Sequence, residues 1–161
     1  MKSASVEVTI TNESKVASLT SPRIFLDISE TTKEPEDIPP GGVGVSSYST
    51  SPASIQCVGV LSYQLGSSLV AVMFETPVAM GELCPNLGLF VTQDLGLRDR
   101  QDMYSVVKGP DPSPALQRKA VFRSNENELV RVSLAQVQVS GTMTYDTNSL
   151  IKVWVRDVSS E

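Results

Sequence analysis

Residues 54–75 read SIQCVGVLSYQLGSSLVAVMFE and hold two apolar segments on either side of a short turn. The segments 54–64 and 68–75 are rich in residues that favour extended strands. Gly66 and Ser67 lie between them, at the length of a hairpin loop. Every residue from 69 to 74 is apolar, so this segment is predicted to be a central strand that is covered on both faces.

Strand signals continue on both sides of this hairpin. Every second residue is β-branched and apolar in segments 6–10 and 151–155, the pattern of a strand with one buried face. Further strands are predicted at residues 23–29, 87–92 and 128–140, which are bounded by Pro, Gly, Asn or Ser. About seven short strands in a chain of this length favour a mainly-β fold, an antiparallel β-sandwich. We expect a single domain over residues 1–161.

The segments between these strands have less regular patterns. In 128–140 the apolar parity changes near Leu134, which predicts a bulge or a strand that crosses between sheets. Residues 94–107 have the spacing of a short amphipathic helix, so one or two short helices are predicted to flank the sandwich. The Pro-rich segments 30–44 and 108–114 are predicted to be loops.

Composition excludes several classes of function. The chain contains no histidine, and its 13 Lys and Arg stand against 18 Asp and Glu, a net charge of −5. Without imidazole, Ser-His-Asp and Cys-His nucleophiles and most transition-metal sites are excluded. The negative charge repels the phosphate backbone of nucleic acids. We therefore expect a protein that is not an enzyme, takes no cofactor and does not bind nucleic acid.

Three features of the sequence have some of the character of a ligand site. Glu34, Glu36 and Asp37 form an acidic cluster whose spacing matches no calcium motif, so no metal site is predicted. Residues 41–44, GGVG, lack the Lys-Ser/Thr of a phosphate loop and are predicted to form a turn. Trp154 falls on the polar side of its strand, where it either contacts a ligand or packs against a loop.

Cysteine usage and hydropathy bear on the compartment. Cys57 and Cys84 are too far apart for a CxxC pair, and they are either two buried thiols or a disulfide formed in an oxidising compartment. The longest apolar run, residues 69–74, is far shorter than the roughly 20 residues that cross a bilayer. Residues 1–5 lead into no apolar segment of a signal peptide. We expect a soluble protein whose membrane contact is peripheral or follows a conformational change.

Several segments, taken in order, resemble the actinoporins, a family of sea-anemone cytolysins with animal relatives. The most specific match is VGVLSY at residues 58–63, followed at hairpin distance by AVMFETP at residues 71–77. Actinoporins have a similar Gly-Val-Leu-x-Tyr and Ala-Val-x-Phe-Ser-x-Pro pair at this point. Other matching segments, in the same order along nearly the whole chain, are residues 6–14, 24–25, 102–104, 141–143 and 150–155.

The resemblance implies a β-sandwich flanked by short helices, an architecture that fungal fruit-body lectins share. Actinoporins bind choline-headgroup lipids, notably sphingomyelin, in a pocket of aromatics with a Ser, a Val and a Pro, and then insert an N-terminal amphipathic helix to form an oligomeric pore. Val58 matches the pocket Val, Pro77 the pocket Pro, and Tyr104 the Tyr of a Met-Tyr pair. The resemblance implies that these three residues contact a lipid headgroup.

Other positions depart from the family pattern. The family's Ser two residues before the Pro is Glu75 here, a possible anionic partner for a cationic headgroup, and the family's aromatic loop is replaced by residues 78–86, which contain no aromatic. The paired Tyr that follow in the family align with Lys108 and Gly109. Each aromatic face contributes about 0.5 to 2 kcal/mol to binding a quaternary ammonium, so choline affinity should be weaker than in the family. The first strand begins about five residues from the start, so we expect no pore from this chain alone.

Three functions remain open at this point. The first is a membrane-lipid recognition module that binds choline headgroups, secreted or peripheral at a target membrane. The second is a lectin-like protein that binds a cell-surface glycan on the same scaffold. The third is a structural protein that forms a homo-oligomer through its sheet edges.

Overall fold

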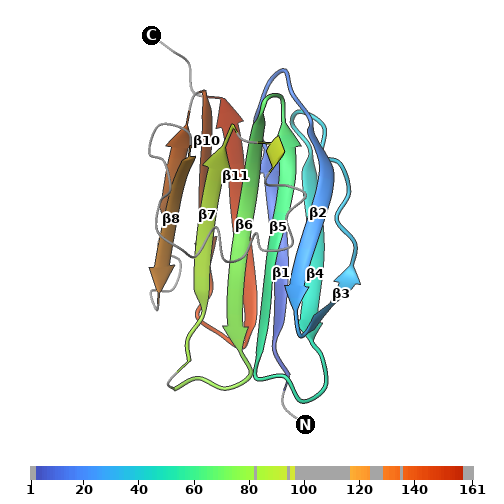
Figure 1. The fold of residues 1–161 in the computed structure, drawn as a ribbon, viewed down its shortest axis with the longest axis vertical. Coiled ribbons are helices and arrows are strands. Elements are labelled where there is room, and N and C mark those ends of the chain that lie inside the picture. The colour runs from blue at the N-terminus through green and yellow to red at the C-terminus, as the bar shows by residue number, and fades with distance from the viewer. Residues whose placement is uncertain are drawn as a thin grey trace.

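The computed structural model describes residues 3–81, 83–93, 95–96, 117–123, 129–134 and 136–157, with the backbone alone for 117–123. These residues form two β-sheets that lie face to face (Figure 1). The strands are β1 (Ser5–Asn12), β2 (Leu19–Asp27), β3 (Ser29–Lys33), β4 (Val43–Thr50), β5 (Gln56–Leu65), β6 (Ser68–Pro77), β7 (Asn86–Thr92), β8 (Gln117–Arg123), β9 (Val130–Leu134), β10 (Val137–Met143) and β11 (Asn148–Asp157).

One sheet has six strands and the other has five. The six-stranded sheet has the order β3-β4-β1-β11-β10-β9, and the five-stranded sheet, nearer the viewer in Figure 1, has the order β2-β5-β6-β7-β8. The pair β1 and β11 is parallel, and every other neighbouring pair is antiparallel. The predicted mainly-β sandwich is therefore confirmed, with more strands than the sequence indicated.

The central hairpin has the predicted form. β5 and β6 pair from Gln56 opposite Pro77 to Leu65 opposite Ser68, across a two-residue turn in which Gly66 has a φ of +59°. A positive φ is easily adopted by glycine, which has no Cβ. All ten residues of β6 are buried, and β6 lies between β5 and β7. The prediction of a doubly covered central strand is confirmed.

The core between the sheets is formed by the inward side chains of both sheets. Tyr48 of β4 stacks on Phe74 of β6 with ring centroids 5.1 Å apart, so one aromatic pair joins the two sheets. The Tyr48 hydroxyl donates to Ser46 Oγ over 2.9 Å. Burial raises the pKa of Tyr48 to about 12, so its hydroxyl stays neutral in the core.

A second apolar cluster covers the outer face of the five-stranded sheet. Val60, Leu69, Ala71, Met73 and Phe90 are buried there, apart from the core between the sheets. Successive side chains of a strand point to opposite faces, so a strand that is covered on both faces must be apolar at every position. This second cluster is the reason why residues 69–74 have no polar member.

Two sequence interpretations were wrong. The change of parity near Leu134 is neither a bulge nor a strand crossing, because β9 ends there and β10 returns antiparallel, with Val137 opposite Leu134. The segment 30–44, predicted to be a loop, contains most of β3 and the start of β4. β4 is rich in serine and therefore lacks the alternation of apolar residues that predicts a strand. Its inward side chains include Ser46 and Tyr48, which are buried.

The predicted turn at residues 41–44 is confirmed at Gly41, whose φ is +77°. The helix predicted at 94–107 lies outside the described residues except for 95 and 96, and the loop predicted at 108–114 lies outside them entirely. Within the described ranges, the structure has no helix with the length and apolar character needed to span a membrane.

Candidate functional site

Two of the sequence-predicted site residues are direct neighbours, and a third lies close to them. Val58 of β5 pairs with Glu75 of β6, and Pro77 lies two residues further along β6, opposite Gln56. Residues that are opposite, or two apart on one strand, share a face of the sheet. Val58, Glu75 and Pro77 therefore share the outer face of the five-stranded sheet, at the end where β6 finishes. Tyr104 lies outside the described residues.

Glu75 is a buried carboxylate at this end of the sheet. Its side chain is only 4% exposed. Asn86, opposite Glu75 on β7, donates from Nδ2 to Glu75 Oε1 over 2.9 Å. On the other side, the Val58 backbone N–H donates to Ser29 Oγ over 3.1 Å. Asn86 therefore fixes one oxygen of the Glu75 carboxyl group in surroundings where electrostatic attraction is stronger than in water.

Exposed apolar side chains gather at the same end of the sandwich. The strands β2, β4, β6 and β10 finish at this end, the lower one in Figure 1. Their connections to the next strands carry exposed apolar residues, which we call the apolar rim: Ile28, Ile55, Met80, Leu83 and Tyr145. Leu129, just before β9, and Leu150, near the start of β11, are also exposed at this end. Only two of the nine exposed large hydrophobics among the described residues, Val16 and Val43, lie at the opposite end.

Backbone hydrogen bonds tie the rim connections to one another. Ser51 N–H donates to the Ile28 carbonyl over 3.2 Å, and Val78 N–H donates to the Ile55 carbonyl over 3.0 Å. Beneath them, Thr76 Oγ1 donates to Ser149 Oγ over 2.9 Å, a buried bond between the two sheets. The rim is therefore supported by hydrogen bonds within and between the sheets.

The charge of the rim connections is low and negative. Residues 51–55, 78–85 and 144–147 contain no Lys or Arg, and their charged residues are Glu82 and Asp146. An anionic surface would gain no attraction from these connections. Their chemistry suits an apolar or zwitterionic partner.

Ile28 of the rim has a strained backbone. Its φ is +47°, a left-handed conformation that a β-branched residue rarely adopts, and its side chain is 64% exposed. Strain of this kind costs on the order of 1 to 3 kcal/mol and occurs most often where function requires it. An exposed isoleucine in this position contributes little to folding, which points to a role in binding.

We expect Ile28→Asn to stabilise the fold by about 1 kcal/mol, because asparagine tolerates the left-handed conformation. Urea unfolding measures the change. Ile55→Asn is the matched control, because Ile55 is 63% exposed on the same rim and does not have a positive φ. Equal stability of the two variants would show that the backbone of Ile28 is not strained.

Residues of the acidic cluster at 34–37 have structural roles. Asp37 Oδ1 accepts from the Ser21 N–H over 3.1 Å, and the Glu36 carbonyl accepts from the Tyr63 hydroxyl over 2.9 Å. Burial also raises the pKa of Tyr63. Within the described part of the chain, no three acidic or cysteine side chains lie close enough together to hold a metal ion.

The two cysteines and Trp154 are not part of the rim. Cys57 is buried and Cys84 half-buried, and they do not form a disulfide. Burial raises the pKa of Cys57 to about 11, so its thiol is a poor nucleophile at neutral pH. Trp154 is half-buried on the outer face of the six-stranded sheet, between Thr11 and Ser140 on the neighbouring strands.

Sequence reasoning missed the apolar rim. Segment 78–86 contains no aromatic residue, and no pattern in it marks Met80 and Leu83 as contact residues. Ile28 and Ile55 fall inside the predicted strands 23–29 and 54–64, whereas in the structure β2 ends at Asp27 and β5 begins at Gln56. An isolated apolar residue at a turn is the only sequence signal that could have indicated them.

Comparison with known proteins supports the fold. No family model matches the chain, and no curated protein matches it either. Among solved structures, it is similar to a crystal structure of the lipid binding protein Nakanori, with a TM-score of 0.62 and 13% sequence identity over 94% of this chain and 70% of that chain. The two packed sheets thus define an actinoporin-like β-sandwich, and at this identity the likeness concerns the fold alone.

Proposed function

We propose that this protein is a non-enzymatic module that binds peripherally to the surface of lipid bilayers and recognises choline headgroups. The apolar rim enters the interface between headgroups and acyl chains. Val58, Glu75 and Pro77 lie buried at the same end of the sheet, and Glu75 attracts the headgroup by its charge. The similarity to a lipid-binding protein of the same fold supports this proposal.

The observation that carries the proposal is the gathering of exposed apolar side chains on separate connections at one end of the sandwich. Scattered single hydrophobics are ordinary on a protein surface, but a cluster marks an interaction site. The cluster has the form of several tips around one end instead of a flat face. Such tips suit a soft lipid interface, which each side chain can enter separately.

Charge favours a zwitterionic bilayer over an anionic one. Peripheral proteins that bind anionic lipids present clusters of Lys and Arg. This chain has a net charge of −5, and its rim connections contain no basic residue. The attraction to the bilayer must therefore come from apolar burial and from the cationic part of the headgroup.

Glu75 is the group that selects a choline headgroup in this proposal. Its carboxylate lies between Val58 and Asn86 at the end of the sheet that carries the rim. A quaternary ammonium has no hydrogen to donate, so it is recognised by charge and by apolar contact with its methyl groups. Glu75 supplies the charge, Val58 and Pro77 supply its apolar surroundings, and the exposed side chains of the rim supply the apolar contact.

Vesicle sedimentation tests the proposal. We expect the protein to bind vesicles of phosphatidylcholine and sphingomyelin, and to bind phosphatidylglycerol vesicles about tenfold more weakly. Absence of binding at every lipid composition, or a preference for phosphatidylglycerol, would overturn it.

Glu75→Gln tests the headgroup contact. The glutamine retains an Oε1 acceptor for Asn86 but loses the charge, so we expect binding to phosphatidylcholine vesicles to weaken about three- to fivefold. Glu13→Gln, exposed in the β1–β2 connection at the opposite end of the sandwich, is the matched control and should bind as the unchanged protein does. If both variants bind alike, Glu75 does not contact the headgroup.

A further inference from the structure

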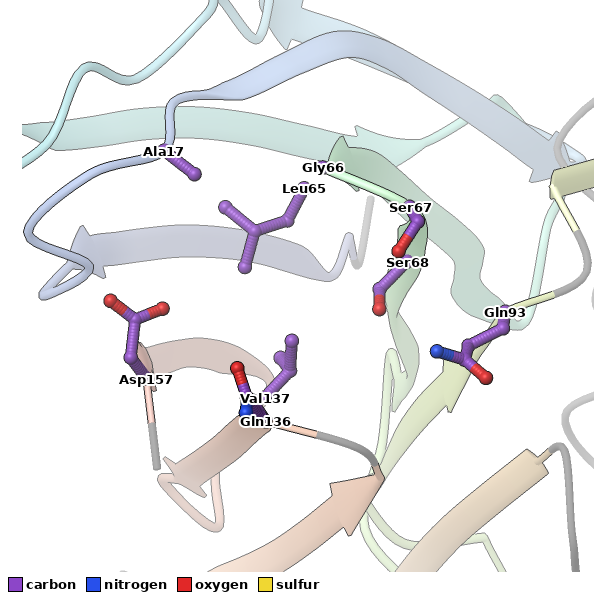
Figure 2. Close-up of a pocket in the computed structure, with 9 residues that line it drawn as sticks. All are labelled: Ala17, Leu65, Gly66, Ser67, Ser68, Gln93, Gln136, Val137 and Asp157. Carbon is purple, nitrogen blue, oxygen red and sulfur yellow. The ribbon is translucent and has the colours of Figure 1, made fainter. Parts of the chain in front are cut away.

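A cavity of about 440 Å³ opens at the end of the sandwich opposite to the apolar rim. The turn between β5 and β6 contributes Ser67, the turn between β9 and β10 contributes Gln136, and β11 ends there with Asp157. Both sheets therefore contribute to its wall (Figure 2). Its volume lies in the range of small-molecule sites, roughly 300 to 1,000 Å³.

Polar side chains surround an apolar floor in this cavity. Leu65 and Val137, one from each sheet, extend toward each other in Figure 2 and are almost completely buried. Around them lie the hydroxyls of Ser67 and Ser68, the amides of Gln93 and Gln136, and the carboxylate of Asp157. The cavity thus combines an apolar base with groups that donate and accept hydrogen bonds.

The Asp157 carboxylate is held in position by the β1–β2 connection. Its Oδ2 accepts from Ser14 Oγ over 3.0 Å and from the Lys15 N–H over 3.2 Å. Among the described residues, no hydrogen bond to its other oxygen, Oδ1, is found. One oxygen is therefore anchored while the other can accept from a ligand, and an acceptor held in advance loses little freedom on binding.

The composition of the lining selects the class of ligand. Among the described residues, the lining has no Lys or Arg, so a phosphate or an acidic sugar would meet the Asp157 charge without compensation from them. The described lining residues also include no aromatic ring to hold a quaternary ammonium. Amides and hydroxyls both donate and accept, as the hydroxyl groups of a sugar do, and the apolar floor matches the C–H face of a sugar ring.

We infer that this cavity is a second binding site, which takes a neutral sugar through Gln93, Asp157 and the Ser67 and Ser68 hydroxyls. It is separate from the proposed lipid surface, because the two lie at opposite ends of the strands. A protein with both sites can hold a neutral glycan at one end while the other end rests on a bilayer.

Nuclear magnetic resonance of the ¹⁵N-labelled full chain tests this inference. The probes are glucose, galactose, mannose and N-acetylglucosamine, with glucuronic acid and choline as charged comparisons. We expect at least one neutral sugar to shift the side-chain amide signals of Gln93 and Gln136, and neither charged compound to do so. No shift from any neutral sugar, or shifts from a charged compound alone, would overturn the inference.

Two variants and a control locate the site. Gln93→Ala should weaken binding of the active sugar about three- to tenfold, because it removes one hydrogen-bonding amide. Ser67→Trp should abolish binding, because its ring fills the mouth of the cavity from an exposed turn. Gln138→Ala removes the same amide from the outer face of the six-stranded sheet and should bind as the unchanged protein does.

Sugar binding that survives Ser67→Trp would overturn the assignment to this cavity. Thermal unfolding of each variant shows that the fold is retained. Vesicle binding should be unchanged in all three variants, so failure of the sugar site and failure of the proposed lipid function give different results.

Discussion

Replacing Ile55 and Leu83 together by serine is expected to lower binding to phosphatidylcholine vesicles about ten- to a hundred-and-fiftyfold. Complete burial of a large aliphatic side chain stabilises by about 1.5 to 3 kcal/mol, and partial entry into the headgroup region by about half of that. Two such losses give about 1.5 to 3 kcal/mol. The fold should keep its stability, because both side chains are exposed.

The matched control for this pair is Val16→Ser with Val43→Ser. These valines are 85% and 60% exposed, and they lie at the opposite end of the sandwich. The control should bind vesicles as the unchanged protein does. Equal losses in the two double variants would mean that general hydrophobicity, and not the rim, determines binding.

Phe74→Ala is expected to destabilise the fold by about 3 to 5 kcal/mol. Phe74 is completely buried and stacks on Tyr48, so its removal leaves a cavity at the contact between the two sheets. The loss is a large fraction of the 5 to 15 kcal/mol that a domain of this kind typically has. Urea unfolding followed by circular dichroism measures it.

Phe25→Ala is the control for the aromatic core. Phe25 is half-buried on the outer face of the five-stranded sheet, where it packs against the second apolar cluster. Its loss should cost about 1 to 2 kcal/mol, because the site is partly open to water. If the two variants are equally stable, the Tyr48–Phe74 pair is not the main contact between the sheets.

The central hairpin was predictable because its information is local. The turn needs Gly66, the strands need β-branched residues, and a doubly covered strand needs an apolar residue at each position. All three signals occur within residues 54–75. The resemblance to actinoporins adds Val58, Glu75 and Pro77, and the register of β5 with β6 places Val58 opposite Glu75.

Other elements were not predictable because their signals are weak or ambiguous. A change of parity has the same appearance in a bulge and in a tight hairpin, and only the pairing of Leu134 with Val137 distinguishes them. β4 is rich in serine, and its strand conformation follows from pairing with β1 and β3 more than from its own residues.

The class of fold follows from the sequence alone, because alternation and apolar runs indicate which face of each strand is buried. The position of the two proposed binding surfaces, in contrast, depends on the three-dimensional fold. The rim residues come from connections far apart in the sequence, and the sugar cavity is lined by residues of both sheets. Their proximity depends on strand order and register, which hydrogen bonds between distant segments establish and no local pattern encodes.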